Sequence, residues 1–261
     1  MVDFIGTNAN NATLGGYDDQ YGAGGDDLLR GDATGKDLYG GSGNDILLGG
    51  GSSASGSGTE QDPIIFTTFQ TSPNNVIEGG SGDDVLYGAG GDDVLYGGSG
   101  NDSGVVQIGG GEIPGSFFYK AGIYGGDGDD SLYGGKGNDL LDGGLGKDHQ
   151  YGGQDADTFV FNDILDSSKK KSLADVIHDF EHKLDKIDLS GIDANETKAG
   201  DQDFDYIKKK KFSDEAGELR YKKGYLMGDT DGDGKKDFAI KVETDLLKHG
   251  DYKLTGSDLI L

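Results

Sequence analysis

The sequence predicts an all-β protein in which short parallel strands coil into a roll, followed by a second region of different composition. Three observations lead to this prediction: a nine-residue repeat, a content of 51 glycines in 261 residues, and an uneven distribution of charge. Residues 1–160 hold 42 of the glycines, a density that disfavours helices and an ordinary packed core. The same residues hold 5 Lys/Arg and 25 Asp/Glu, a net charge of −20, whereas residues 161–261 hold 18 and 23, a net charge of −5. We therefore predict two regions, residues 1–152 and residues 153–261.

The acidity of the chain indicates which ligands it can bind. A net charge of −25 with only 33% hydrophobic residues is typical of disordered chains, so a compact fold requires cations to neutralise it. We expect no nucleic acid partner, because phosphate binding requires a basic face. Cysteine is absent, which excludes disulfides and thiolate metal sites. We also expect neither a cleaved signal peptide nor a membrane anchor, because the chain shows no basic segment followed by an apolar run and no long apolar stretch.

The repeat reads G-G-x-G-x-D-x-U-x, where U is apolar, and its clearest copies begin at Gly40, Gly79 and Gly134. Six glycine-rich residues can form a tight turn, and the last three can form a short strand with one inward side chain. Two repeats then make one coil, so turns on one side of the roll recur every 18 residues. A flexible glycine-rich linker, the alternative interpretation, would have no reason to keep position eight apolar. That position holds Leu29, Leu38, Leu47, Ile77, Leu86, Leu95, Ile123, Leu132, Leu141 and Phe159.

Aspartates at position six should face one another across the gap between successive coils, which are about 4.8 Å apart. Carboxylates in such a gap repel unless a hard divalent cation with about six to eight oxygen ligands lies between them. We therefore predict that the repeats bind several Ca²⁺ ions. The pairs separated by 18 residues are Asp27 with Asp45, Asn75 with Asp93, Asp84 with Asp102, Asp130 with Asp148, and Asp139 with Asp157.

Position nine and two interruptions of the repeat mark the outside of the predicted roll. Position nine is repeatedly tyrosine, which predicts a stacked outer row, with a surface for sugar or membrane as the alternative. The interruptions, at about residues 51–74 and 103–122, are predicted to be loops that either contact a partner or pack back on the roll. The tyrosines are Tyr87, Tyr96, Tyr124, Tyr133 and Tyr151.

These repeats resemble the RTX (hemolysin-type calcium-binding) family, in which the same nine-residue consensus recurs. The resemblance implies a right-handed parallel β-roll in which the position-six aspartates and turn carbonyls bind calcium between coils. Asn75, Asp155 and Gln150 depart from the consensus, which places the sites beside them in question. The carbonyls implied are those of Gly79, Gly80, Gly82, Gly125, Gly126, Gly128, Gly134, Gly135 and Gly137.

The C-terminal hundred residues have a different pattern. Residues 157–162, 175–180 and 185–190 resemble the C-terminal region of serralysin-type proteases and the R-modules of mannuronan C-5-epimerases. This resemblance implies a β-rich cap on the roll. Periodicity alone predicts a helix over residues 173–187, which would place His178, Glu181 and His182 on one face as the H-x-x-E-H zinc pattern. The two interpretations conflict, and the resemblance favours strands.

A second acidic motif lies in the C-terminal region. Asp229, Asp231, Asp233 and Asp237 follow the spacing of the first nine positions of an EF-hand loop, although position twelve is Ile240 rather than Glu. We predict a calcium-capable hairpin loop, with a solvated Asp-Gly turn as the alternative.

Two short basic runs, Lys169–Lys171 and Lys208–Lys211, stand out in so acidic a chain. Most such runs are solvated faces, and contact with an anionic polysaccharide or a lipid is the alternative.

The chain closes on Asp258, Leu259, Ile260 and Leu261, which resemble the C-terminal export signal of type I secretion substrates. The resemblance implies export by the type I machinery and a secreted, extracellular protein. We expect no catalytic activity, because neither H-E-x-x-H nor G-x-S-x-G occurs. The first functional hypothesis is a calcium-binding interaction protein similar to the nodulation proteins of rhizobia, acting at a host or cell surface. A carbohydrate-binding accessory module and, more remotely, a small metallohydrolase are the alternatives.

Overall fold

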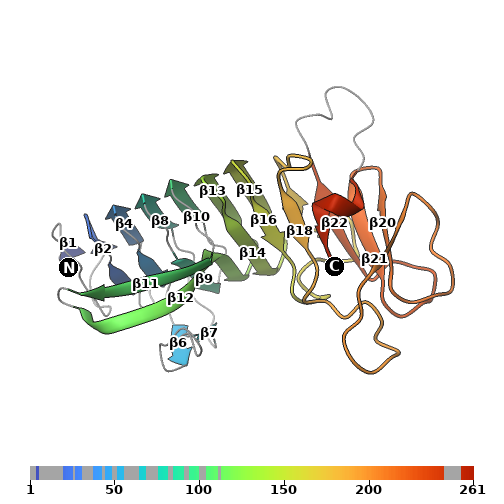
Figure 1. Cartoon of the computed structure of the whole chain (residues 1–261), viewed down its shortest axis with the longest axis horizontal. Coiled ribbons are helices and arrows are strands. Elements are labelled where there is room, and N and C mark those ends of the chain that lie inside the picture. The colour runs from blue at the N-terminus through green and yellow to red at the C-terminus, as the bar shows by residue number, and fades with distance from the viewer. Residues whose placement is uncertain are drawn as a thin grey trace.

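The computed structural model is built from strands (Figure 1). In the part of the chain that it describes, the only helical element is the 3₁₀ turn η2 (Gly256–Asp258). No helix among these residues has the length and apolar character that a membrane crossing requires. The described residues are 4–5, 20–25, 27–30, 38–42, 45–48, 52–55, 65–68, 76–81, 85–90, 94–99, 104–110, 113–243 and 254–261.

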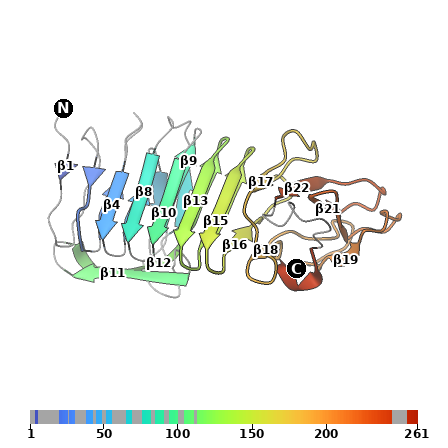
Figure 2. The ribbon, with the colours of Figure 1, turned by 90° about the horizontal axis from the view of Figure 1, so that it is seen from above.

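Two long sheets form opposite walls of the roll and continue into the cap (Figures 1 and 2). The first is 12-stranded, in the order β1 (Phe4–Ile5), β2 (Gln20–Tyr21), β4 (Leu38–Ser42), β8 (Val76–Ser81), β10 (Val94–Ser99), β13 (Ser131–Lys136), β15 (His149–Gln154), β17 (Val176–Ile177), β22 (Phe238–Val242), β21 (Tyr225–Asp229), β20 (Glu218–Lys222) and β19 (Asp205–Lys208). The second is 9-stranded, in the order β23 (Leu259–Ile260), β18 (Lys186–Asp188), β16 (Thr158–Val160), β14 (Leu140–Leu145), β12 (Ile113–Asp127), β9 (Val85–Gly90), β5 (Ile46–Leu48) and β3 (Leu28–Arg30), with β11 (Gly104–Gly110) paired to β12.

Successive repeats alternate between the two sheets, and within each sheet the strands formed by the repeats pair in parallel. Leu132 of β13 is in register with Gln150 of β15, and Leu141 of β14 with Phe159 of β16, each 18 residues further on. This register confirms the predicted parallel β-roll of two repeats per coil.

The two interruptions of the repeat form antiparallel hairpins where the sequence predicted loops. The first contains β6 (Ser52–Ser55) and β7 (Ile65–Thr68), and the second contains β11 paired with the first part of β12. Neither shifts the register of the roll, because Leu38 still pairs with Ile77 and Leu86 with Ile123. The insertions therefore add length without disturbing the stacking of position-six residues.

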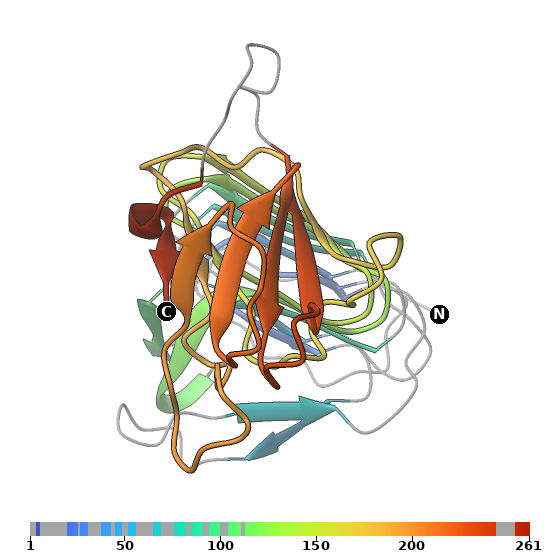
Figure 3. The ribbon, with the colours of Figure 1, turned by 90° about the vertical axis from the view of Figure 1, so that its right-hand side faces the viewer.

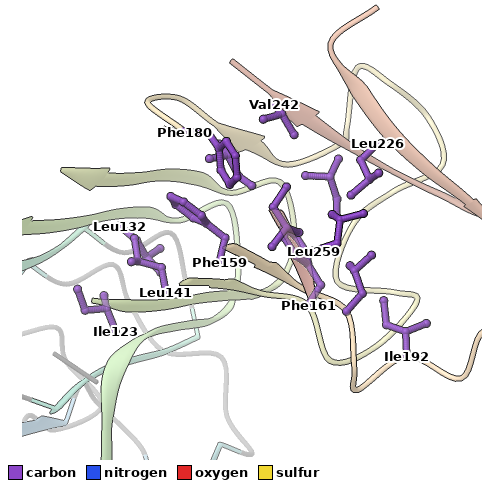
Figure 4. Packing of buried hydrophobic residues seen from close by; sticks show 14 of the residues in the cluster. Ile123, Leu132, Leu141, Phe159, Phe161, Phe180, Ile192, Leu226, Val242 and Leu259 are labelled. Atoms are coloured by element: carbon purple, nitrogen blue, oxygen red, sulfur yellow. The ribbon is translucent and has the colours of Figure 1, made fainter. Parts of the chain in front are cut away.

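Position-eight side chains fill the space between the two walls, as the sequence predicted. All ten of these residues are fully buried, and the row continues through Phe159 into a wider cluster in the cap that includes Phe161, Phe180 and Leu259 (Figure 4). Fully burying one such side chain stabilises a fold by about 1.5–3 kcal/mol. Each coil contributes only two of them, so apolar burial in the roll is small compared with that in the cap.

The cap is a β structure that closes one end of the roll, seen face-on in Figure 3. Strands β20, β21 and β22 pair antiparallel, while β17 pairs in parallel with both β15 and β22. The helix that periodicity alone predicted over residues 173–187 is wrong, because this stretch contains β17 and the start of β18. Leu173 and Leu184, which would complete the helical apolar face, are 50% and 38% exposed.

The predicted outer row of tyrosines is stacked along the 12-stranded sheet. Ring centroids are 4.9 Å apart for Tyr96 and Tyr133, 4.7 Å for Tyr133 and Tyr151, and 4.3 Å for Tyr151 and His178. Tyr124 lies on the other sheet, in β12, and the side chain of Tyr87 lies outside the described residues. Stacked rings cover one another's faces, so the row presents ring edges rather than flat faces to a ligand.

Gln150 interrupts the apolar row, and replacing it tests how much folding stability this interruption costs. Its side chain is fully buried between Leu132 and Ile177, and neither amide atom has a hydrogen-bond partner. We expect Gln150→Leu to stabilise the calcium-saturated protein by about 1–3 kcal/mol, because a buried unsatisfied amide is replaced by an apolar group. The converse change Leu132→Gln should destabilise it. Urea unfolding at saturating calcium measures both, and a lower stability of Gln150→Leu would contradict this interpretation.

Candidate metal centre

Position-six aspartates stack one above another along the roll. The backbone N–H of Asp130 donates to Oδ1 of Asp148 at 2.8 Å, and that of Asp139 donates to Oδ1 of Asp157 at 3.0 Å. Asp27 and Asp45 make the same contact at 2.8 Å near the other end of the roll. All of these aspartates are buried. The structure thus brings together three of the five predicted pairs, and the residues Asn75, Asp84, Asp93 and Asp102 lie outside its described part.

The first glycine of each repeat makes room for the carboxylate of the same repeat. A Cβ atom built on Gly125 would lie 2.4 Å from Oδ2 of Asp130, and one on Gly143 would lie 2.3 Å from Oδ2 of Asp148. Both distances are shorter than any tolerated contact. Glycine is therefore required at position one because the second carboxylate oxygen occupies the space of a side chain.

The second glycine brings the backbones of successive turns close together. Gly135 has φ +112°, and a Cβ atom there would lie 2.2 Å from the carbonyl oxygen of Gly98 in the preceding coil. Gly144 stands in the same relation to the carbonyl of Gly126, also at 2.2 Å. The third glycine of the repeat allows the same close approach, because a Cβ atom on Gly146 would overlap the carbonyl oxygen of Gly128. Carbonyls of the glycine turns therefore lie between successive coils, and calcium binding by the predicted carbonyls stays a prediction. Gly82 lies outside the described residues.

The aspartate stack extends beyond the repeats into the cap. The N–H of Asp148 donates to Oδ1 of Asp175, and that of Asp157 donates to Oδ1 of Asp185, both at 3.1 Å. Asp175 and Asp185 were not predicted from the sequence, because they follow their partners by 27 and 28 residues rather than 18. Each of the two nevertheless lies two residues before a buried isoleucine, as Asp175 does before Ile177. This Asp-x-Ile order is the sequence signal that could have identified both aspartates.

The environment of the stacked carboxyl groups disfavours their ionised form. Burial, reinforced by Asp175, raises the pKa of Asp148 to about 9. Burial likewise raises the pKa of Asp175 to about 8, that of Asp157 to about 8, and that of Asp185 to about 6. These shifts mean that ionised carboxylates here require a compensating positive charge at neutral pH.

The oxygens in these gaps suit a hard divalent cation. Oδ2 of Asp148 and Oδ2 of Asp175 are buried and accept no hydrogen bond. A buried carboxylate oxygen without a donor is rare, and it is the atom that a metal ion would contact. Calcium prefers about six to eight oxygen ligands from carboxylates and backbone carbonyls, and these gaps are lined by both. The residues present therefore fit calcium, which also agrees with the chemistry that the repeat predicts.

The acidic loop between β21 and β22 is a second candidate site. Carboxylate oxygens of Asp229, Asp231 and Asp237 lie within 4.8 Å of one another. Asp229 is fully buried and accepts the N–H groups of Gly232 at 2.8 Å and Gly234 at 3.0 Å. The loop joins two strands, as predicted.

The fourth aspartate predicted for this loop lies apart from the other three. Asp233 pairs with the ammonium group of Lys235 at 2.6 Å instead of joining the cluster. Position twelve, Ile240, is buried in β22 and offers no ligand. The loop thus gathers three carboxylates rather than the four that its spacing predicted.

The H-x-x-E-H residues do not converge on one metal position. Nδ1 of His178 lies 3.0 Å from Glu243, and its Nε2 lies 2.7 Å from Nδ1 of His149. Nδ1 of His182 instead lies 2.8 Å from Asp258. Because the stretch is not helical, the two histidines have separate partners, and the zinc interpretation has no structural support.

The C-terminal tetrapeptide is part of the folded cap. Leu259 and Ile260 form β23 and pair in parallel with β18, with Leu259 only 8% exposed. Asp258 is fully buried and accepts hydrogen bonds from the N–H of Lys183 at 3.1 Å and the N–H of Thr255 at 2.6 Å. Asp258 and Leu259 of the predicted export signal are therefore buried once the cap has folded, whereas Ile260 is 40% exposed.

The raised pKa values predict an unusual pH dependence for the metal-free protein. A folded-state pKa above the ordinary value of 3.8 means that the fold binds protons more tightly than the unfolded chain. Stability contributed by Asp148, Asp175 and Asp157 should be complete below pH about 4 and should be lost as the pH rises towards about 9. Circular dichroism and urea unfolding in EDTA should thus show more β structure at pH 5 than at pH 8.

Asp148→Asn provides the control for this pH effect, because an amide occupies the position without titrating. The variant should lose part of the difference between pH 5 and pH 8. Equal stability of the metal-free wild-type protein at both values would contradict the assignment.

Comparison with known proteins identifies the family of the chain from its sequence. Residues 96–254, more than half of the chain, match the family described as peptidase M10 serralysin C terminal, and residues 72–103 match the RTX calcium-binding nonapeptide repeat. Among solved structures, the AlgE6R3 subunit of the Azotobacter vinelandii mannuronan C5-epimerase is 28% identical with a TM-score of 0.41, covering 65% of this chain and 77% of that chain. The AlgE6R2 subunit of the Azotobacter vinelandii epimerase is 30% identical with a TM-score of 0.36, covering 53% and 80%. No curated protein matches. The chain is thus a member of the serralysin C-terminal family that carries RTX calcium-binding repeats.

Proposed function

We propose that this calcium-binding protein is exported unfolded by the type I secretion machinery, folds outside the cell on binding Ca²⁺, and acts there without catalysis as an interaction protein at a host or cell surface. The observation that supports this proposal most strongly is the stack of buried aspartates that continues from the repeats into the cap. Metal ligands in this role are the position-six aspartates, the turn carbonyls, Asp175, Asp185 and the loop carboxylates Asp229, Asp231 and Asp237.

The chain should be unfolded wherever free calcium is scarce. Extracellular calcium modules have Kd values of about 10⁻⁴–10⁻³ M, far above the free calcium concentration inside a cell. Without the ion, aspartates such as Asp148 and Asp175 would have to remain protonated or repel each other at neutral pH. When bound, calcium supplies positive charge and oxygen coordination in each gap, so that its binding free energy becomes folding free energy. Each coil then templates the next, as in other repeat proteins.

The location of the C-terminal tetrapeptide supports export before folding. Leu259 is buried and Asp258 is held by Thr255 and Lys183 in the folded cap, so a transporter could read these side chains only in the unfolded chain. The serralysin C-terminal and RTX families are typical of secreted proteins, which agrees with this order of events.

A role in binding rather than catalysis is supported by the partners of the histidines that a zinc site would use. His178 contacts Glu243 and His149, and His182 contacts Asp258. A carbohydrate-binding accessory module is the second candidate function. It is favoured by a recess in the cap that is lined by Tyr206 and Lys208 of β19, by the following Lys209, and by Tyr221 of β20.

Calcium titration followed by circular dichroism tests the proposed folding step. We expect coil in EDTA and β structure in calcium at about 10 mM, well above the expected Kd. Asp139→Asn should raise the calcium concentration at half-folding several-fold, because it removes a buried ligand charge. The matched control is Glu78→Gln, which removes one charge from the exposed outer row and should leave the midpoint nearly unchanged. Identical spectra in EDTA and in calcium would defeat the proposal.

A further inference from the structure

Two of the four histidines of the chain meet on the outer face of the 12-stranded sheet, where the roll joins the cap. His149 begins β15, the last repeat strand of this sheet, and His178 directly follows β17, the first cap strand. The two strands are parallel neighbours, with His149 in register with Val176 (Figure 2). Because side chains alternate between the two faces of a sheet, His149 and His178 lie on the same face, two positions apart in register.

The two imidazole rings point towards each other through one nitrogen each. Nδ1 of His149 lies 2.7 Å from Nε2 of His178, the ring centroids are 5.0 Å apart, and the ring planes differ by 18°. The centroid separation exceeds the nitrogen separation by about one ring diameter, so the rings lie edge to edge in nearly one plane. The bonding directions of both nitrogens therefore converge on one point between the rings.

Glu243 determines which nitrogen of His178 carries the proton. One oxygen of Glu243, Oε2, lies 3.0 Å from Nδ1 of His178, and the other pairs with the ammonium group of Lys241. The hydrogen bond from Lys241 lowers the pKa of Glu243, so the carboxylate is ionised at neutral pH and can only accept. Nδ1 of His178 is then the donor, which leaves the lone pair of Nε2 directed at His149. A carboxylate on the far nitrogen is the usual support of a metal-binding histidine.

The histidine pair is held in place and is also open to solvent. The ring of Tyr151 stacks on that of His178, with centroids 4.3 Å apart and planes that differ by 5°. The side chain of His178 is 22% exposed, and His149 is half-buried. An ion can thus reach the two nitrogens from solvent, and water can complete its coordination. Imidazole nitrogen suits ions such as Zn²⁺, Cu²⁺ and Ni²⁺, whereas Ca²⁺ prefers oxygen.

We propose that His149 and His178 form a transition-metal site, with an ion such as Zn²⁺ bound by Nδ1 of His149 and Nε2 of His178 and with water as its remaining ligands. The proton on Nδ1 of His149, which the two nitrogens share in the hydrogen bond, moves to Nε2 of the same ring. Both imidazoles stay neutral, and the ion takes the place of that proton. Tetrahedral zinc with Zn–N bonds of about 2.0–2.1 Å requires the nitrogens to separate by roughly 0.6 Å, which a small side-chain rotation supplies.

This site differs in ligands and in consequence from the others described above. His182 of the H-x-x-E-H motif takes no part in it, because its Nδ1 lies 2.8 Å from Asp258. The ion would connect the roll directly to the cap, next to the short pairing of His149 with Val176 and of Gln150 with Ile177. The proposal therefore goes beyond calcium-dependent folding, and it requires only that calcium has folded the roll and the cap.

Isothermal titration of the full chain with Zn²⁺ tests the proposal, in saturating calcium so that the carboxylate sites are occupied. We expect one tightly bound equivalent. His149→Gln should weaken its affinity by about tenfold or more, and Glu243→Gln by about tenfold, because the first removes a ligand and the second weakens the support of the other ligand. The matched control is His182→Gln, which removes a histidine outside the site and should change the affinity less than about twofold.

Nuclear magnetic resonance of the unaltered chain, labelled with ¹⁵N-histidine, identifies the ligands directly. Zinc should shift the ring-nitrogen resonances of His149 and His178 and leave those of His182 in place. No zinc binding in saturating calcium, equal affinities of the wild-type protein and His149→Gln, or an equal loss in His182→Gln would overturn the proposal. Circular dichroism of the same samples reports whether calcium has folded each variant. Because the resonance measurement uses the wild-type chain, it decides the question even for a variant that fails to fold.

Discussion

Repulsion between stacked carboxylates is the constraint on which the rest of this structure depends. The parallel β-roll places Asp130 under Asp148 and Asp148 under Asp175, all buried, with each backbone N–H donating to the next carboxylate. Such a column of charge is unfavourable without a cation, and favourable with one. We therefore propose that the fold of this calcium-binding chain is conditional on its ligand, and that the aspartates proposed to bind the ion also determine when the chain is compact.

The glycines and the narrow core follow from this constraint. Carboxylate oxygens occupy the side-chain space of position-one glycines such as Gly143, and close turn carbonyls require glycine at positions such as Gly135. In a roll built this way the buried apolar side chains are mainly those at position eight of each repeat, whereas the cap buries large side chains including Phe161 and Phe180. We infer that the burial of apolar side chains in the cap stabilises one end of the roll, on which the coils can stack.

Sequence reasoning predicted most of the roll and less of the cap. A strict period of nine places Asp139 and Asp157 18 residues apart, so the roll and its candidate sites follow from arithmetic once two repeats form a coil. In the cap the period ends, and the stack continues through Asp175 at a spacing that only the folded chain reveals. Periodicity also predicted a helix where Leu173 lies exposed, because short strands separated by turns can imitate a 3.6-residue repeat. In the acidic loop the spacing predicted four ligands, but Asp233 pairs with a neighbouring lysine instead.

The most direct test of the account is a crystal of the full chain grown in calcium and measured for anomalous scattering. The account predicts peaks between coils, within about 2.3–2.6 Å of carboxylate oxygens in the Asp130–Asp148 and Asp148–Asp175 gaps and of the neighbouring turn carbonyls. A roll that is ordered in the presence of calcium but shows no peak in these gaps would contradict it.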